Sequence, residues 1–386
     1  MPTTSVVVLC HRPADWLAAS LGSIADQADE VILVDNGSPG GSAAATGRSA
    51  GAVVVEPGRN LGYAAGVNLG VSRASGELVA LLNDDAVAGA GWLAAAASTL
   101  SDPQVAAVTP RIRYPGWWVE LTFDDESWSA PGDPRVLGRQ LTSVTADGSE
   151  VLDALRGPGV HALEHSPGAD PPRWRWTQPG EAVFVPVAGP GSVVGVGGEP
   201  VQGRPCRLLN KAGSWLQADG TLLDRGDGEP DDGRYRRPVS QFFASGTAVV
   251  FRAETWQRVG GLAEPFFAYY EDADWGWRAR LAGLDLVYDP SVVVEHLQGA
   301  TSGGAASPLV RRLAPGNHAL CLARNAPVPA AVSLIRRELR RRERDGARRS
   351  LLARLPWGVA SRRRLARGWA LSPQEVWDRW AGASLG

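Results

Sequence analysis

Polar side chains follow three apolar runs at the points where buried strands would end. Asp84 and Asp85 close ELVALLNDD, Asp35 closes EVILVD, and His296 closes SVVVEH far downstream. Two adjacent carboxylates repel one another and resist burial, so a strand end tolerates them best when a cation shares the site. Mg²⁺ or Mn²⁺ would bind there through one or two carboxylates and the phosphates of a substrate. An Asx turn would give the same dipeptide, so both interpretations stay open at this point.

Asp35 is followed by Asn36, Gly37 and Ser38, a turn-forming sequence. A carboxylate that projects from a strand end before such a turn can hold a nucleotide base or a ribose hydroxyl by charge-assisted hydrogen bonds. The segment therefore predicts a nucleotide contact, with a simple turn as the alternative.

The segment NLGYAAGVNLG places Gly62, Gly66 and Gly70 on one face of a predicted helix, with Asn60 at its cap and Asn68 one turn further on. Each glycine costs about 1 kcal/mol of helix stability relative to alanine. A close approach of a ligand or of another backbone explains such a stripe. Both explanations stay open.

Three acids, Glu271, Asp272 and Asp274, crowd the first turn of a predicted helix in FFAYYEDADWGWR. Favourable interaction with the helix dipole explains two of them. Apolar rings next to a carboxylate raise its pKa, which suits a general base that deprotonates a hydroxyl. His296 ends its strand as Asp85 ends its own, so the two could meet on one metal ion, although a histidine at a strand end is often structural.

The elements that must position these residues alternate between strand and helix patterns. Strands are predicted at 5–10, 30–35, 52–56 and 77–83, and helices at 13–25, 62–74 and 91–100. This rhythm predicts an α/β fold with a mostly parallel sheet flanked by helices. A β-rich insertion rich in Gly, Pro and Trp follows. After it, strands are predicted at 245–252, LDLVYD and SVVVEH, and a helix is predicted at 270–283.

Beyond Pro315 the pattern is helical, and residues 336–367 carry thirteen Arg against three acids, with interleaved Leu. Such a helix rests on an anionic membrane surface or packs on its own domain with a solvated basic face. The sequence favours neither.

Composition excludes several classes of protein. The formal net charge of −2 does not indicate a nucleic-acid-binding protein, and we expect no nucleic-acid partner. Three scattered cysteines and no long apolar run argue against a disulfide framework, a zinc cluster and a transmembrane anchor, so we expect a cytoplasmic protein. The first strand lacks the Gly-rich loops that a sugar-1-phosphate nucleotidyltransferase or a dinucleotide-dependent dehydrogenase would need.

The ordered series of motifs resembles the inverting family 2 glycosyltransferases of GT-A fold, especially the bacterial rhamnosyl- and galactofuranosyltransferase-like branch. The matching segments are VVVLCHRP, LVDNGS, the N-x-G-x-A-x-G-x-N-x-G pattern, LLNDD, FFAYYEDADWGWR and VVVEH. One departure is that the first strand ends in Cys10 and His11, where the family usually has a Tyr-Asn-like pair, and another is Asn83 at the first position of the DxD-like motif.

The resemblance implies a role for each matching residue. Asp272 would be the catalytic base, and Asp85 and His296 would bind Mg²⁺ or Mn²⁺. The nucleotide sugar would contact His11, Asp35, Asn60, Gly62, Asn68 and Asp84. Supporting or acceptor-side roles would fall to Glu271, Asp274, Trp275 and Arg278.

The implied function is metal-dependent transfer of a sugar, with inversion, from a UDP- or dTDP-sugar to a hydroxyl of a glycan, lipid-linked or small-molecule acceptor. A catalytically silent nucleotide-sugar-binding scaffold protein is the alternative from another class. We expect four parts: a half that binds the nucleotide sugar (1–110), the β-rich insertion (111–240), a half that holds the acceptor and the catalytic base (241–312), and a helical Arg-rich extension (313–386). A lipid-linked acceptor would suit peripheral contact of 336–367 with the inner face of the plasma membrane.

Overall fold

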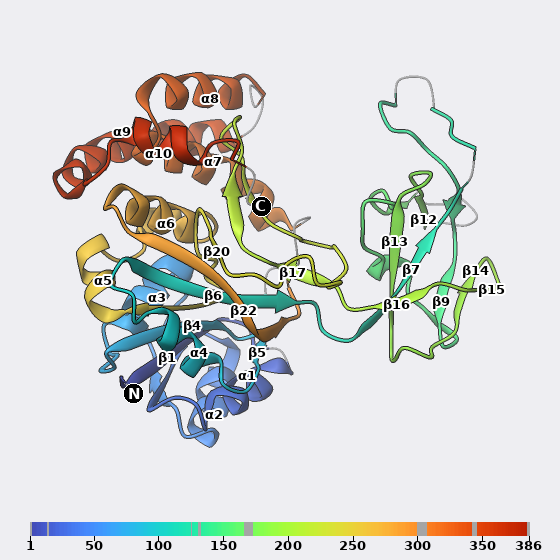
Figure 1. Cartoon of the computed structure of the whole chain (residues 1–386), viewed down its shortest axis with the longest axis horizontal. Coiled ribbons are helices and arrows are strands. Elements are labelled where there is room, and N and C mark those ends of the chain that lie inside the picture. Colours follow the sequence, from blue (N-terminus) through green and yellow to red (C-terminus); the bar gives the residue numbers. More distant parts are fainter. Residues whose placement is uncertain are drawn as a thin grey trace. The chain divides into compact units, whose positions relative to one another are not determined.

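A computed structural model describes residues 2–13, 15–124, 126–129, 133–165, 173–298, 307–341 and 346–383 (Figure 1). The chain divides into two compact units. The first comprises residues 1–112, 211–225 and 236–386, and the second comprises 113–210 and 226–235. Residues 211–225 thus belong with the first unit, although they lie inside the segment that the sequence assigns to the insertion.

A central mixed sheet organises the first unit. Its parallel half runs in the order β3 (Val53–Val55), β2 (Glu30–Asp35), β1 (Thr4–Cys10) and β4 (Leu78–Asn83). The order continues through β21 (Ala248–Arg252), β6 (Val105–Arg113), β22 (Asp285–His296) and β20 (Val239–Ser240), with β5 (Ala86–Ala88) on β22. The predicted strands LDLVYD and SVVVEH form the single strand β22, whose pairing continues through both.

Helices cover both faces of this sheet because the β-branched strands alternate their side chains. Val6 and Val8 face α1 (Trp16–Ile24), α2 (Ser42–Ser49) and α4 (Trp92–Thr99). Val7 faces the opposite side, where α3 (Tyr63–Val71), α5 (Ala253–Val259) and α6 (Glu271–Leu281) pack. Buried side chains at period two explain this arrangement, and they confirm the predicted α/β fold class.

The C-terminal helices are α7 (Pro308–Asn325), α8 (Val328–Arg341), α9 (Gly346–Leu365) and α10 (Pro373–Trp380). They form a layer on the outer side of α6, visible in Figure 1. Trp277 and Leu281 of α6 pack there against Leu320 and Val376. Helix α6 is therefore buried on all sides, between the sheet and the C-terminal layer.

The first unit also contains the two-stranded sheet of β18 (Ser214–Leu216) and β19 (Leu222–Asp224). Within the part of the chain that the structure describes, no helix is long and apolar enough to cross a membrane.

The second unit is built from short strands, which confirms the predicted β-rich insertion. Its core gathers Val119, Leu121, Leu141, Val183 and Val185. The strands are β7 (Trp117–Thr122), β8 (Gln140–Leu141), β9 (Val144–Ala146), β10 (Ser149–Glu150), β11 (Glu164–His165), β12 (Arg173–Trp176), β13 (Ala182–Val187), β14 (Val194–Val196), β15 (Glu199–Val201) and β16 (Arg204–Cys206). Strand β17 (Leu209–Lys211) contains the boundary along the chain, with Lys211 in the first unit.

Candidate active site

Strand register brings the sequence-predicted acids to one edge of the sheet. Cys10 pairs with Asp35, and Leu9 pairs with Asn83, so the carboxyl ends of β1, β2 and β4 are level. Strand β22 arrives antiparallel to β5 and sets His296 opposite Ala86. Loops after parallel strands diverge at such an edge and leave room for a ligand.

The Asp35 carboxylate is held by its own loop. Its Oδ1 accepts the Ser38 amide at 2.7 Å, and its Oδ2 accepts the Ser38 hydroxyl at 2.9 Å and the Ala44 amide at 3.0 Å. The carboxylate thus fixes the turn that follows β2 and the start of α2. Two carboxylate oxygens offer about four acceptor positions, so the residue retains capacity for one more donor.

A second polar cluster links the β2 loop to the start of α3. The buried Asn36 amide donates to Asn60 Oδ1 at 3.1 Å and to the Gly62 carbonyl at 3.2 Å, and its oxygen accepts the Leu61 amide at 2.8 Å. His11 Nδ1 lies 3.0 Å from the Asn36 carbonyl. Asn36 therefore fixes three of the predicted nucleotide-site residues, namely His11, Asn60 and Gly62.

Gly62 combines a positive φ of 82° with close packing. A Cβ there would lie 2.5 Å from the Phe267 ring and 2.7 Å from the Phe267 carbonyl, which accepts the Ala64 amide at 3.2 Å. The absence of a side chain at Gly62 therefore lets the loop before α6 pack closely against α3. In the same way, Gly66 and Gly70 let the side chains of Leu9 and Val7 of β1 pack against the helix. Close packing against neighbouring segments therefore explains why the three glycines lie on one face of the helix.

Asn68 lies away from this edge. Its amide nitrogen donates to the Leu262 carbonyl and its oxygen accepts the Leu262 amide, both at 2.9 Å. Both polar ends of the side chain thus tie α3 to the segment that precedes α6.

Asp85 and His296 lie side by side although they are far apart in the sequence. His296 Nε2 is 3.1 Å from Asp85 Oδ1, and Asn83 Nδ2 is 3.5 Å from the same nitrogen. Both side chains are about 5% exposed. The Leu297 amide also donates to the Asp85 carbonyl at 3.0 Å, so the end of β22 and the turn after β4 are fixed together.

Electrostatic effects on Tyr63 connect this pair of residues to the acids of α6. Burial raises the pKa of the Tyr63 hydroxyl well above its usual value, and the charges of Glu271, Asp272, Asp84 and Asp85 raise it further. Four acids from two distant segments therefore act on one hydroxyl. The structure thus brings the end of β4 and the start of α6 near the same hydroxyl.

The surroundings of Cys10, at the end of β1, show the same cluster of acids. Burial raises the pKa of its thiol first, and the neighbouring Asp84, with Asp35 and Asp85, adds to the shift. A thiol in this environment stays protonated and acts as a small apolar side chain rather than as a nucleophile.

Asp272 is the second residue of α6, and its carboxylate is anchored by two backbone amides. Oδ2 accepts the Gly246 amide at 3.1 Å and Oδ1 accepts the Ala273 amide at 2.8 Å. Burial nevertheless raises the pKa of Asp272, while the charge of Lys211 and the two amides oppose the rise. A carboxylate with an elevated pKa and fixed orientation suits proton abstraction.

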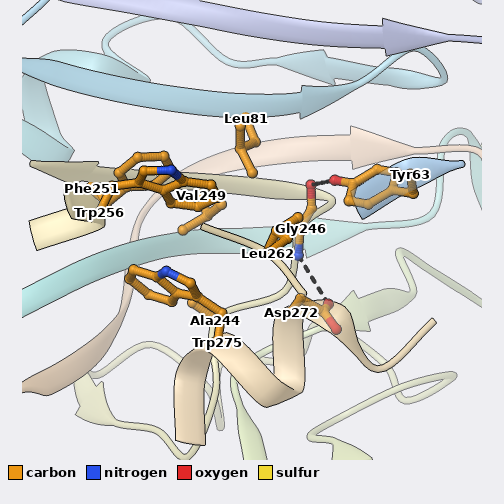
Figure 2. Close-up of a pocket in the computed structure, with 10 residues that line it drawn as sticks. All are labelled: Tyr63, Leu81, Ala244, Gly246, Val249, Phe251, Trp256, Leu262, Asp272 and Trp275. Carbon is orange, nitrogen blue, oxygen red and sulfur yellow. Dashed lines mark hydrogen bonds between the residues drawn. The ribbon is translucent and has the colours of Figure 1, made fainter. Parts of the chain in front are cut away.

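A small cavity of about 20 Å³ lies beside Asp272 (Figure 2). Figure 2 shows Asp272 reaching the Gly246 amide, while the Tyr63 hydroxyl donates to the Gly246 carbonyl at 2.8 Å. Most of the lining is apolar and includes Leu81, Ala244, Val249, Phe251, Trp256, Leu262 and Trp275. The space holds about one water molecule, so the carboxylate has an apolar, poorly hydrated side.

Glu271 is more deeply buried than Asp272. Burial, and then the charge of Asp272, raise the pKa of Glu271 from 4.5 to about 8. Among the residues that the structure describes, Glu271 Oε2 has no hydrogen-bond partner. The side chain is therefore a neutral acid near pH 7.

Replacing Glu271 with glutamine is expected to remove most of a pH-dependent instability. The folded protein binds a proton at Glu271 between pH 4.5 and about 8 that the unfolded chain does not bind. Stability is therefore full below pH 4.5 and falls as the pH rises toward 8, by up to about 5 kcal/mol. Urea unfolding at pH 5 and pH 9 measures this. The exposed Glu254→Gln is the control, and an unchanged pH dependence in E271Q contradicts the assignment.

The loop before α6 holds unusual backbone conformations. Phe267 has φ 64° and ψ −62° and closes a γ-turn in which the Ala268 amide donates to the Phe266 carbonyl at 2.8 Å. Tyr269 and Tyr270 also have positive φ values, 70° and 72°. Each such residue costs on the order of 1–3 kcal/mol, so surrounding contacts must hold the loop.

Asn317 of α7 supplies those contacts. Its buried amide nitrogen lies 2.8–2.9 Å from the carbonyls of Phe266, Ala268 and Tyr269 and shares its two hydrogens among them. Arg354 of α9 donates to Asn317 Oδ1 at 2.7 Å. The C-terminal extension thus sets the conformation from which Glu271 and Asp272 emerge.

Asp274 and Arg278 lie in a buried ion cluster rather than at the edge of the sheet. Arg278 Nε donates to Asp274 Oδ2 at 2.9 Å, and Arg324 Nε donates to Asp274 Oδ1 at 2.6 Å. The pKa of Asp274 is lowered despite its burial, chiefly by the charges of Arg324 and Arg278. Trp275 is also buried and stacks on Trp256 with ring centroids 5.7 Å apart. These three predicted residues support α6 from within the core.

Several residues that position the site were missed by sequence reasoning. Asn317 and Arg324 lie in the extension, where an Arg-rich composition gave no indication of inward contacts. Asn36 was visible as the residue after Asp35, and Lys211 as the lone lysine of the chain. Tyr63 follows Gly62 and carried no signal of its own.

Comparisons with known proteins identify relatives of the chain by sequence and by fold. Residues 5–144 match the family described as Glycosyl transferase family 2. The chain is 27% identical over 304 residues to N-acetylglucosaminyl-diphospho-decaprenol L-rhamnosyltransferase of Mycobacterium tuberculosis, in strains CDC 1551 / Oshkosh and ATCC 25618 / H37Rv, covering 77% of each chain. Its fold is similar to that of GalNAc-T7, solved with UDP, GalNAc and Mn²⁺, with a TM-score of 0.54 at 12% identity. That match covers 98% of this chain and 56% of GalNAc-T7.

The α/β fold and these matches define an enzyme of the glycosyltransferase class with the GT-A fold. Within that class, residues 5–144 match glycosyltransferase family 2, and the relatives from Mycobacterium tuberculosis extend the similarity over 304 residues. The predicted family is confirmed, and the scaffold and nucleotidyltransferase alternatives are not supported.

Proposed function

We propose that the chain is a metal-dependent inverting transferase that moves a sugar from a UDP- or dTDP-sugar to an acceptor hydroxyl. The observation that carries this proposal is that one turn joins the two sets of acids. The Gly246 amide donates to Asp272 Oδ2 at 3.1 Å, and the Thr247 carbonyl accepts the amide of Asn83, which precedes Asp84 and Asp85, at 2.9 Å. One set of groups suits a nucleotide diphosphate and the other suits a hydroxyl that must lose its proton.

The donor would lie along the carboxyl edge of β1, β2 and β4. Asp35, fixed by Ser38 and Ala44, would accept a donor hydrogen from the base or ribose. His11 and Asn60 border the same loop. Asp84 is next to Asp85, which together with His296 would bind the metal ion. This placement follows the general rule for ligands in α/β sheets.

Asp85 and His296 fit a divalent cation. Their facing oxygen and nitrogen atoms lie 3.1 Å apart and are buried. No group of three or more His, Cys, Asp or Glu side chains suited to a metal occurs in the described ranges, so diphosphate oxygens and water would complete the coordination. An imidazole ligand favours Mn²⁺ over Mg²⁺, which prefers oxygen. When bound, the cation would neutralise the charge of the departing diphosphate.

Asp272 would act as the base in a single displacement. The acceptor oxygen would attack the anomeric carbon while the bond from that carbon to the diphosphate breaks, and the hydroxyl proton would pass to Asp272. Attack opposite the leaving group inverts the anomeric centre and needs no nucleophilic carboxylate. Glu271, which is neutral near pH 7, would not compete for the proton.

The relatives from Mycobacterium tuberculosis are named for rhamnosyl transfer to a decaprenol-linked acceptor. On that likeness we propose a lipid-linked glycan as the acceptor. Exposed Val328 and Val332 on α8, together with the basic residues of 336–367, would support peripheral contact with an anionic membrane. Arg354 and Arg362 face inward and donate to Asn317 and to the Ala326 carbonyl, so only part of this basic segment is available. Co-sedimentation with anionic vesicles tests the contact.

A panel of UDP- and dTDP-sugars tests the donor proposal. A matching donor at 100 times its dissociation constant is expected to stabilise the protein by about 2.7 kcal/mol in the presence of Mn²⁺. In titrations of Mn²⁺ with donor present, His296→Ala should lower the apparent affinity for Mn²⁺ at least tenfold. The exposed control Asp26→Asn should leave this affinity unchanged. Equal stabilisation of H296A and wild type by Mn²⁺ and donor would remove His296 from the site.

A further inference from the structure

Lys211 is the lone lysine of a chain that contains 39 basic residues of the Lys and Arg types. Its side chain is 17% exposed and lies in the first unit. Its ammonium lies 3.1 Å from Asp224 Oδ2 and donates to the Ser245 hydroxyl at 2.8 Å. The single lysine side chain therefore occupies a defined, largely buried position.

The Ser245 contact reaches the base through one short turn. Ser245 precedes Gly246, whose amide donates to Asp272 Oδ2 at 3.1 Å. The Ser245 hydroxyl also lies 3.2 Å from Thr247 Oγ1, and Tyr63 holds the Gly246 carbonyl. A Cβ on Gly246 would lie 2.6 Å from the Tyr63 hydroxyl oxygen, so the turn is tightly confined. A shift of Ser245 would displace the amide that orients the Asp272 carboxylate.

The charges around the base make this position important. Burial and the charge of Asp224 disfavour the carboxylate form of Asp272, whose own charge in turn raises the pKa of Glu271. The positive charge of Lys211 acts in the opposite direction on both Asp272 and Glu271. Asp274 is neutralised separately by Arg324 and Arg278.

We propose that Lys211 is a positioning residue for sugar transfer: it fixes the Ser245–Gly246–Thr247 turn against Asp272 and supplies the positive charge that faces the two acids at the start of α6. This inference rests on the proposed role of Asp272 as base. A compact ammonium is a point charge on a flexible stem, whereas a planar guanidinium would need more room and would direct its donors in a fixed fork.

The test is the pH profile of kcat/KM for the full-length protein with the donor identified by the panel. Lys211→Met is expected to move the acidic limb to higher pH by about 0.5–1 unit, because Asp272 loses its opposing charge. At pH 6 the loss in kcat should be several-fold larger than at pH 9, with the donor KM nearly unchanged. Lys211→Arg should keep the limb close to that of wild type, since the charge remains.

Asp224→Asn provides a second variant with the opposite sign. Removing this acid should move the acidic limb to lower pH, because Asp224 disfavours the charged form of Asp272. Arg312→Met, an exposed cation, is the matched control. A uniform loss at every pH in K211M, or limbs that shift in the same direction in K211M and D224N, would overturn the inference. Retained transfer in D272N would instead overturn the proposed base and leave the Lys211 contacts without a catalytic meaning.

Discussion

Replacing Asp272 with asparagine is expected to lower kcat for sugar transfer by about 10²–10⁴-fold, the usual contribution of a positioned general base. Asparagine can still accept the Gly246 or the Ala273 amide, so the start of α6 should keep its conformation. The proton of the acceptor hydroxyl, however, would have no carboxylate to receive it. Donor affinity should change less than about twofold.

Initial rates with saturating acceptor, together with donor titration calorimetry, separate these two effects. Asp26→Asn is the control, because that exposed acid lies away from the carboxyl edge of the sheet. A large loss of donor affinity with normal turnover of bound donor would assign Asp272 to donor binding. Transfer at wild-type rates in D272N would move the base to another residue.

The fold was largely predictable because local patterns and long-range packing agree. Strand β1 alternates side chains toward two helical layers, as the run SVVVLC predicts, and β2 and β4 pair with it in register. Register then places Asp35 and Asn83 at one edge without further information. The continuous strand β22 was read as two because Pro290 interrupts its pattern, although the strand passes through this residue.

The roles of residues within the site were less predictable than their positions. The sequence placed three acids at the start of α6, and the structure gives them three environments. Asp272 faces the Gly246 turn, Glu271 is buried without a cation at contact distance in any described ion pair, and Asp274 is clamped by two arginines. Spacing along one helix turn cannot distinguish these environments, because the partners come from α7 and from the β17 region.

The C-terminal extension shows why composition was ambiguous. Thirteen arginines in residues 336–367 suggested a solvated or membrane-facing surface. Arg354 instead reaches the strained loop through Asn317, and Arg362 donates to the Ala326 carbonyl. Arginines that point into the protein and arginines that point into solvent give the same amino-acid composition, so only their tertiary contacts distinguish them.

Asp274→Asn is expected to destabilise the protein by about 3–5 kcal/mol, because it leaves Arg278 and Arg324 buried beside a neutral amide. Both guanidiniums are about 5% exposed or less, and Asp274 is fully buried. The cluster also joins α6 to α7, since Asn325 donates to Asp274 Oδ1 at 2.8 Å. Loss of the carboxylate should therefore loosen the C-terminal layer along with the ion cluster.

Urea unfolding at pH 7 measures this loss, and the exposed helical acid Asp378→Asn is the matched control. The double variant D274N/R324M should recover part of the stability, because it removes one of the two uncompensated charges. Such recovery distinguishes a buried-charge penalty from simple loss of hydrogen bonds. A loss below about 1 kcal/mol in D274N would mean that Arg278, which also donates to the Val259 carbonyl, satisfies its charge through backbone carbonyls. Helix α6 would then be fixed mainly by the packing of Trp275 and Trp277.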